Sequence, residues 1–105
     1  MSSHTAVIHW QRGDARFTDN RYSRAHRWQF DGGAVVEASS SPHVVPLPYS
    51  NPAGVDPEEA FVASLSSCHM LFVLFYAAND GYLIESYVDR ALGTLDRDDR
   101  GRQSM

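Results

Sequence analysis

The segment that follows Asp56 constrains the fold more than any other part of the sequence. Asp56 is a typical helix N-cap, Pro57 suits the first helical position, and Glu59 stands at the capping-box position three residues after the cap. Apolar side chains then recur every three or four residues along one stripe: Phe61, Leu65, Cys68, Phe72 and Phe75. Residues 70–78 are apolar on every side. These features predict a long helix that ends at residues 79–81 and that other elements must enclose on most sides.

Strand patterns precede this helix. Residues 5–11 alternate between two faces, and residues 22–30 and 34–38 flank Asp-Gly-Gly at positions 31–33, which is typical of a hairpin turn. All five prolines lie between positions 42 and 57, so residues 39–55 should form an ordered but irregular loop. N-terminal antiparallel strands packed on one long helix make an α+β fold.

The C-terminal region predicts an incomplete hairpin. Residues 82–95 have strand-like content, and residues 98–101 have the composition of a turn, after which only four residues follow. The strand would therefore lack a full partner. A chain of this size also buries only about 60% of the surface that its unfolded form exposes. We expect the chain to be truncated at its C-terminus or to be completed by another chain.

Composition narrows the class of function. The 105 residues make one domain at most, and the formal net charge is −4, with nine arginines, no lysine and no basic stripe to hold phosphates. This pattern argues against a nucleic-acid partner. Residues 70–78 are far fewer than the roughly 20 apolar residues that cross a bilayer, and the N-terminus lacks a signal-peptide pattern. We expect a soluble, cytoplasmic protein that does not bind membranes.

Cys68 is the only cysteine, so it is either a packed apolar side chain or a reactive group. It lies twelve residues after the N-cap, beyond the first turn in which the helix dipole acts, so an ionised thiol there needs a nearby cation. Arg24 is the best candidate. Period two along residues 22–30 places it on the same face as Tyr22 and other aromatic residues, where a guanidinium needs an anion. A structural ion pair or a solvated edge position also explains Arg24.

Capping and compensation of the helix dipole can explain both Glu58 and Glu59; they account fully for Glu59 and leave Glu58 available for another role. Ten residues separate Glu58 from Cys68, about 15 Å of helical rise, so the two share a site only through a helix break or a second subunit. His69 points about 100° away from Cys68 and is interpreted as a core or interface side chain rather than a base. No metal or cofactor is expected, because phosphate-binding glycine patterns are absent. Metal-ligand spacing is also lacking among the other histidines: His4, His9, His26 and His43.

A family resemblance lies in the helix and hairpin segments. The helix segment reads VDPEEAFVASLSSCHM at residues 55–70 and resembles the central helix of the family of osmotically inducible protein C (OsmC) and the organic hydroperoxide resistance proteins. The segments NRYSRAHRWQFDGG at 20–33 and ASSSP at 38–42 resemble the N-terminal hairpin of its OsmC-like branch. The resemblance runs from about residue 7 to residue 101. It implies an OsmC-like fold that forms an intertwined dimer, with active sites at the subunit interface.

The same resemblance implies a chemistry. Members of this family are thiol-dependent peroxidases that reduce organic hydroperoxides in oxidative stress defence. Cys68 matches the peroxidatic cysteine, Glu58 matches the family's glutamate, and Arg24 is the better match for its arginine, with Arg21 as the alternative. Three apolar neighbours on the helix would bind the substrate: Phe61, Leu65 and Phe72.

Family members continue beyond the position of residue 105, through a segment that bears a second, resolving cysteine. Without that cysteine, an external thiol would have to recycle the oxidised form of Cys68. The alternative hypothesis is a non-catalytic, truncated OsmC-like module or fragment that acts only in assembly or binding.

Overall fold

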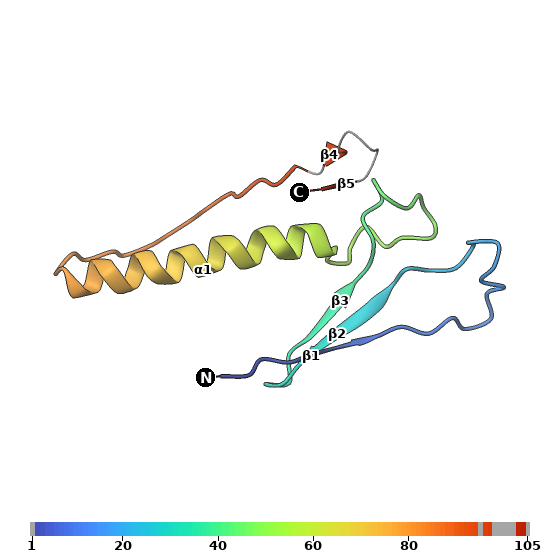
Figure 1. Ribbon diagram of the computed structural model, residues 1–105, viewed down its shortest axis with the longest axis horizontal. Helices are drawn as coiled ribbons and strands as arrows, with labels where there is room; N and C mark the ends of the chain where they lie inside the picture. The colour runs from blue at the N-terminus through green and yellow to red at the C-terminus, as the bar shows by residue number, and fades with distance from the viewer. Residues whose placement is uncertain (1, 95, 98–102, 105) are drawn as a thin grey trace. The chain divides into compact units, whose positions relative to one another are not determined.

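The computed structural model describes residues 2–94, 96, 97, 103 and 104 of the chain (Figure 1). The chain divides into two compact units, Met1–Pro57 and Glu58–Met105. The first unit contains three strands and the loops that join them. The second contains almost all of one long helix and the segment that follows it.

The first unit is built on a three-stranded antiparallel sheet in the order β1-β2-β3. The strands are β1 (Ala6–His9), β2 (His26–Phe30) and β3 (Val35–Ala38). Trp28 lies opposite Ile8 on one side and Val36 on the other, so these three side chains share one face. This architecture, with three antiparallel strands and one long helix, confirms the predicted α+β fold.

The hairpin between β2 and β3 turns where the sequence predicts it. The Phe30 N–H donates to the Ala34 carbonyl, and the Gly33 N–H donates back to the Phe30 carbonyl. Gly33 has φ +99°, a conformation that favours glycine over residues with a Cβ. Glycine at position 33 therefore allows the tight return of the chain.

Strand β2 is shorter than the predicted strand over residues 22–30. Residues 22–25 belong to the connection from β1, and the Arg24 N–H donates to the Tyr49 carbonyl at 2.8 Å instead of joining the sheet. The predicted alternation nevertheless extends through this region, because the even-numbered residues from 22 to 28 are half-buried and the odd-numbered ones are exposed. The prediction was right about the face and wrong about the start of the strand.

The loop over residues 39–55 is ordered and irregular, as predicted. Ser39 is fully buried, and its Oγ accepts a hydrogen bond from the Asn51 N–H at 2.8 Å. Ser50 is also buried, and its hydroxyl donates to the Val45 carbonyl. A Cβ on Gly54 would lie 3.1–3.3 Å from Ala38 and Ser39, so the close approach of these segments favours a glycine. The loop is fixed by polar contacts rather than by an apolar core.

Helix α1 (Pro57–Asn79) begins and ends at the predicted residues. Glu58 and Glu59 lie in its first turn, where carboxylates favour the positive end of the helix dipole. At the other end, the Gly81 N–H donates to the Ala78 carbonyl and the Tyr82 N–H to the Ala77 carbonyl. With Gly81 at φ +84°, these two bonds form a Schellman cap.

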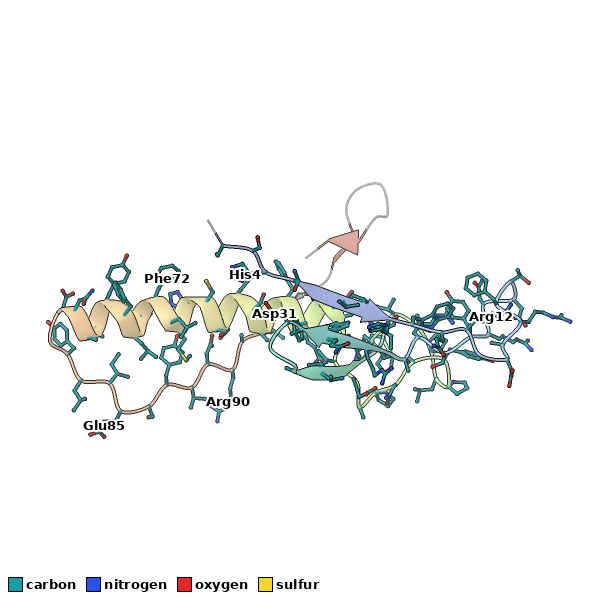
Figure 2. All side chains as sticks on the ribbon, turned by 90° about the horizontal axis from the view of Figure 1, so that it is seen from below. His4, Arg12, Asp31, Phe72, Glu85 and Arg90 are labelled. Atoms are coloured by element: carbon teal, nitrogen blue, oxygen red, sulfur yellow. The ribbon has the colours of Figure 1, made fainter. Side chains whose placement is uncertain are left out.

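No residue of α1 is buried in the described chain. Figure 2 shows its side chains, Phe72 among them, projecting from the ribbon on several sides. Six large apolar residues of the helix are each more than half exposed: Phe61, Leu65, Leu71, Phe72, Phe75 and Tyr76. The helix therefore lacks the enclosure that its composition demands. It is also long and apolar enough to cross a membrane, a property that the core helices of water-soluble proteins share.

The segment after α1 runs back along the helix as an extended chain (Figure 1). Residues 82–94 form no strand, so the strand prediction for this region is wrong over the described residues. Among the described residues, one side-chain hydrogen bond joins this segment to α1. The Ser66 hydroxyl donates to Asp89 Oδ2 at 2.7 Å. Beyond it, β4 (Asp96–Arg97) pairs with β5 (Gln103–Ser104) in antiparallel register. The turn predicted at residues 98–101 lies outside the described residues.

Candidate functional site

Cys68 lies in the middle of α1, and its thiol is exposed. At 100° per residue, Phe61, Leu65 and Phe72 lie within about 60° of it around the helix and share its stripe. These three side chains are 52–58% exposed. In the described chain Cys68 is thus exposed together with its neighbours on the stripe.

A hollow of about 480 Å³ lies beside the Cys68 stripe, within the second unit. Phe61 and Leu65 line it from α1, and Leu92 lines it from the returning segment. Phe72 does not line this hollow; its ring stacks near that of Tyr76, with centroids 6.4 Å apart. Two of the three predicted substrate-binding residues therefore share a cavity, while the third lies on the open part of the stripe.

His69 also lines the hollow, together with the hydrogen-bonded pair of Ser66 and Asp89. The sequence predicts that His69 points away from Cys68. It also places His69 four residues after Leu65, and residues at that spacing are neighbours on a helix surface, so the two can share a cavity. The hollow thus combines an apolar wall with a polar rim.

Glu58 is half-buried in the first turn of α1. The helix is continuous from Pro57 to Asn79, so the ten residues between Glu58 and Cys68 correspond to about 15 Å of rise. The structure therefore excludes the helix break that would bring these two residues together in one copy. A site that uses both residues must therefore combine Glu58 of one copy of the chain with Cys68 of another.

Arg24 belongs to the first unit, where residues 20–22 hold its side chain. Its Nη1 donates to the Asn20 carbonyl at 2.9 Å and to the Tyr22 carbonyl, and its Cζ lies 3.6 Å from the centre of the Tyr22 ring. Within the first unit, the guanidinium thus meets carbonyl oxygens and an aromatic ring, where the sequence predicted an anion. Cys68 and Glu58 belong to the second unit, so the role of Arg24 beside them stays a prediction.

The alternative arginine, Arg21, is exposed and lies next to the same turn. Its backbone N–H donates to Asp19 Oδ1 at 3.0 Å. This bond orients the backbone of Arg21. Over the described residues, hydrogen bonds and a ring contact of the guanidinium are seen for Arg24 and not for Arg21.

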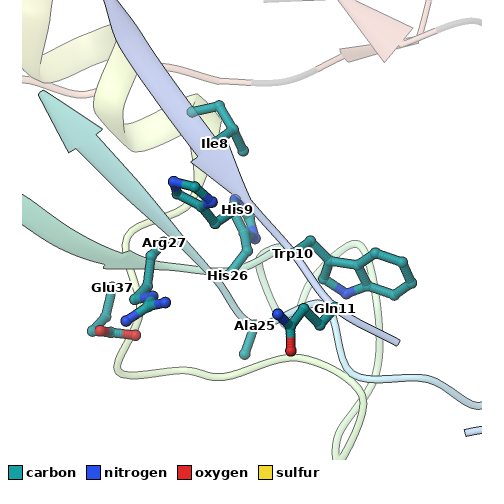
Figure 3. A pocket seen from close by; sticks show the side chains of 8 residues that line it. All are labelled: Ile8, His9, Trp10, Gln11, Ala25, His26, Arg27 and Glu37. Atoms are coloured by element: carbon teal, nitrogen blue, oxygen red, sulfur yellow. The ribbon is translucent and has the colours of Figure 1, made fainter. Parts of the chain in front are cut away.

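A second hollow, which the sequence did not predict, lies on the first unit (Figure 3). Its volume is about 450 Å³, and a cross-strand row of His9, Arg27 and Glu37 contributes to its lining. The three side chains share the face of the sheet opposite Trp28, and all three are exposed. Side chains alternate between the two faces of β2, so the sequence places Arg27 on the face opposite Trp28. The row forms a solvated polar face.

Over the described residues, no group of three or more His, Cys, Asp or Glu side chains is placed to hold a metal ion. Cys68 itself does not line the hollow of the second unit, whose lining is apolar apart from Ser66, His69, Asp89 and Thr94.

Comparison with known proteins gives one extensive structural match. No protein-family model and no curated protein matches the chain. Among solved structures, the chain is similar to an OsmC-like protein of unknown function from Vibrio cholerae. The two share 59% sequence identity with a TM-score of 0.93, over 99% of this chain and 68% of that one. The similarity extends over both units of the chain, including the hairpin and α1.

Proposed function

Because this chain belongs to the OsmC family, we propose that it is a thiol-dependent peroxidase that reduces organic hydroperoxides through Cys68. The observation that carries the proposal is the exposed thiol of Cys68 on an open apolar stripe of α1. A peroxidatic cysteine must reach a dissolved hydroperoxide, and an enclosed thiol does not. The activity would serve oxidative stress defence in the cytoplasm.

The reaction begins with attack of the Cys68 thiolate on the distal oxygen of ROOH. The S–O bond forms as the O–O bond breaks, and the leaving alkoxide takes a proton to give the alcohol ROH. Cys68 is oxidised to the sulfenic acid, and the peroxide is reduced by two electrons. An external thiol then displaces water from the sulfenic acid to form a mixed disulfide, and a second thiol releases Cys68 as the free thiol.

Arg24 and Glu58 are proposed to organise this step. The Arg24 guanidinium would stabilise the thiolate and the negative charge that develops on the leaving oxygen. Glu58 would hold the guanidinium through charge-assisted hydrogen bonds. The firm attachment of Arg24 by Asn20 and Tyr22 supports its choice over Arg21, since a guanidinium fixed in place loses little freedom when it binds an anion.

Substrate preference follows from the apolar surroundings of the thiol. Phe61, Leu65 and Phe72 each expose more than half of their surface near Cys68. Burial of an alkyl or aryl group against these side chains is favourable by about 25 cal/mol per Å². A bulky organic hydroperoxide gains this contribution and hydrogen peroxide does not, so we expect the organic substrate to react faster.

We further propose that the active form is a homodimer. Continuous helical geometry keeps Glu58 and Cys68 of one copy about 15 Å apart, so a site that uses both needs a second copy. The uncovered apolar side chains of α1 supply a surface for that copy, because a monomer rarely leaves so large an apolar patch in water. The dimer would have two equivalent sites.

The test is oxidation of the folded chain by cumene hydroperoxide in the presence of a sulfenic-acid trap, followed by intact mass measurement. We expect one trap adduct on wild type and none on Cys68→Ser. A parallel reaction with hydrogen peroxide should give the adduct more slowly. Circular dichroism confirms that both proteins are folded. A folded wild type without an adduct would remove the peroxidase from consideration.

A second function, that of a non-catalytic assembly module, is favoured by one observation. The absence of any buried residue in α1 within the described chain fits a protein whose main task is to pair with another surface. Gel filtration together with the trap experiment separates the two functions. A stable assembly whose thiol resists oxidation supports the module, and a reactive thiol supports the enzyme.

A further inference from the structure

The Arg24 side chain is held by residues of a single tight turn. Both hydrogen bonds that the first unit gives to it start from Nη1, one to the Asn20 carbonyl and one to the Tyr22 carbonyl. These bonds use both hydrogens of Nη1. The guanidinium also stacks on the Tyr22 ring. Within this unit, the Nε and Nη2 edge of the guanidinium is left for another partner.

The ring under the guanidinium is itself fixed on two sides. Tyr22 meets Trp10 edge-on with centroids 5.5 Å apart, and it packs against Phe17 at 4.8 Å. The Trp10 indole N–H donates to the Ser23 carbonyl at 2.9 Å, which ties the cluster to the chain just before Arg24. An edge-to-face aromatic pair with a satisfied indole N–H is a rigid arrangement.

The turn that presents the Asn20 carbonyl is also specific. Asn20 has φ +64°, and its N–H donates to the Phe17 carbonyl at 2.9 Å. Asparagine is among the residues that accept a left-handed conformation most readily. The backbone and the ring therefore approach the guanidinium from two directions. An arginine side chain held in this way has given up its rotamer freedom before it meets an anion.

We propose that Tyr22 is a positioning residue for Arg24 in the peroxidase reaction. Its ring and carbonyl hold the guanidinium in one position before charge develops during oxidation of Cys68. The inference rests on the proposed function, in which Arg24 stabilises that charge. Tyr22 acts through Arg24 and does not itself touch the peroxide.

The proposal is tested by measuring the rate at which cumene hydroperoxide oxidises Cys68 in wild type, Tyr22→Leu and Tyr22→Phe. Tyr22→Leu loses the cation–π contact between the ring and the guanidinium, so its rate of Cys68 oxidation should be about two- to fivefold lower than that of wild type. Tyr22→Phe keeps the ring and the backbone carbonyl, so its rate should stay within about twofold of wild type. Val7→Ala is the control, since Val7 is an exposed apolar residue of β1 on the face of the sheet opposite Trp28, and its rate should equal that of wild type.

A double-mutant cycle separates positioning from general support of the fold. If Tyr22 acts through Arg24, Tyr22→Leu should have no further effect on the rate in the Arg24→Ala background. An equal loss in both backgrounds would overturn the proposal. Should Tyr22→Leu not fold, Tyr22→Met removes the ring with a side chain of similar length, and the same comparison applies.

A measurement of motion keeps the proposal testable even if the proposed peroxidase activity fails. The ¹⁵N relaxation of Arg24 Nε reports how firmly the guanidinium is held and needs no catalysis. We expect an ordered Nε in wild type and in Tyr22→Phe, and a mobile one in Tyr22→Leu. Equal order in all three proteins would refute positioning by Tyr22, whatever the peroxide assay shows. A wild type that does not react with peroxide would instead refute the proposed function.

Discussion

Complementation between two inactive variants examines whether the site is shared between copies of the chain. Cys68→Ser removes the reacting sulfur, and Glu58→Gln removes the charge that is proposed to hold Arg24. Hydrogen bonds to charged groups contribute about 1.5–3 kcal/mol, so Glu58→Gln should slow the reaction about tenfold or more. Because α1 is continuous, Glu58 and Cys68 of one copy lie about 15 Å apart and cannot act together.

The expected gain follows from this separation. In an equal mixture that assembles at random, about half of the dimers contain one copy of each variant. A site formed from the Cys68 of one copy and the Glu58 of the other is intact once in every such dimer. The mixture should therefore recover about one quarter of the wild-type activity, well above the average of the two separate variants.

The assay is peroxide consumption with cumene hydroperoxide and a small dithiol, after the two variants have been unfolded together and refolded as one sample. Gel filtration checks that the mixture is dimeric. If each site were formed within one copy, the mixed dimer would contain no intact site. Activity equal to half that of Glu58→Gln alone would therefore refute the shared site.

Two substitutions test the account of stability. Ser39→Ala removes the buried acceptor of the Asn51 N–H and should lower the free energy of unfolding in urea by about 1–3 kcal/mol. In the control Ser41→Ala, the lost Oγ accepts an exposed hydrogen bond, so the free energy of unfolding should fall by less than about 0.5 kcal/mol. Similar losses for the two variants would contradict the role of the buried hydrogen bond. Gly81→Ala places a Cβ on a residue at φ +84° and should destabilise the helix end by about 1 kcal/mol in a urea titration followed by circular dichroism, while Gly32→Ala should be near neutral. An unaffected Gly81→Ala would show that the Schellman cap contributes little.

Local signals in the sequence were sufficient for the helix and the hairpin. Asp56, Pro57 and the glycine at position 81 define the ends of α1 through capping chemistry that acts within one turn. The start of β2 was missed for a physical reason. The Tyr22 ring packs with Trp10 and Phe17, contacts that depend on side chains twelve and five residues away rather than on strand periodicity.

The strand prediction for residues 82–95 failed over the described residues because strand formation needs a partner as well as a suitable composition. Val88 and Leu92 are 75% and 90% exposed, as expected for an apolar segment that pairs with no strand among the described residues. For the site, the sequence predicted the stripe of Cys68, Phe61 and Leu65, because helical spacing determines it. It could not predict the clamp on Arg24, which depends on the left-handed turn at Asn20.

The activation of the Cys68 thiol is tested most directly by its second-order rate constant for oxidation by cumene hydroperoxide, compared with that of N-acetylcysteine at the same pH. Stabilisation of developing charge by a fixed donor typically contributes a factor of about 10²–10³. We therefore expect Cys68 in the folded dimer to react at least about a hundredfold faster than the free thiol. Equal rate constants would show that the exposed cysteine is an ordinary thiol and would contradict the peroxidase.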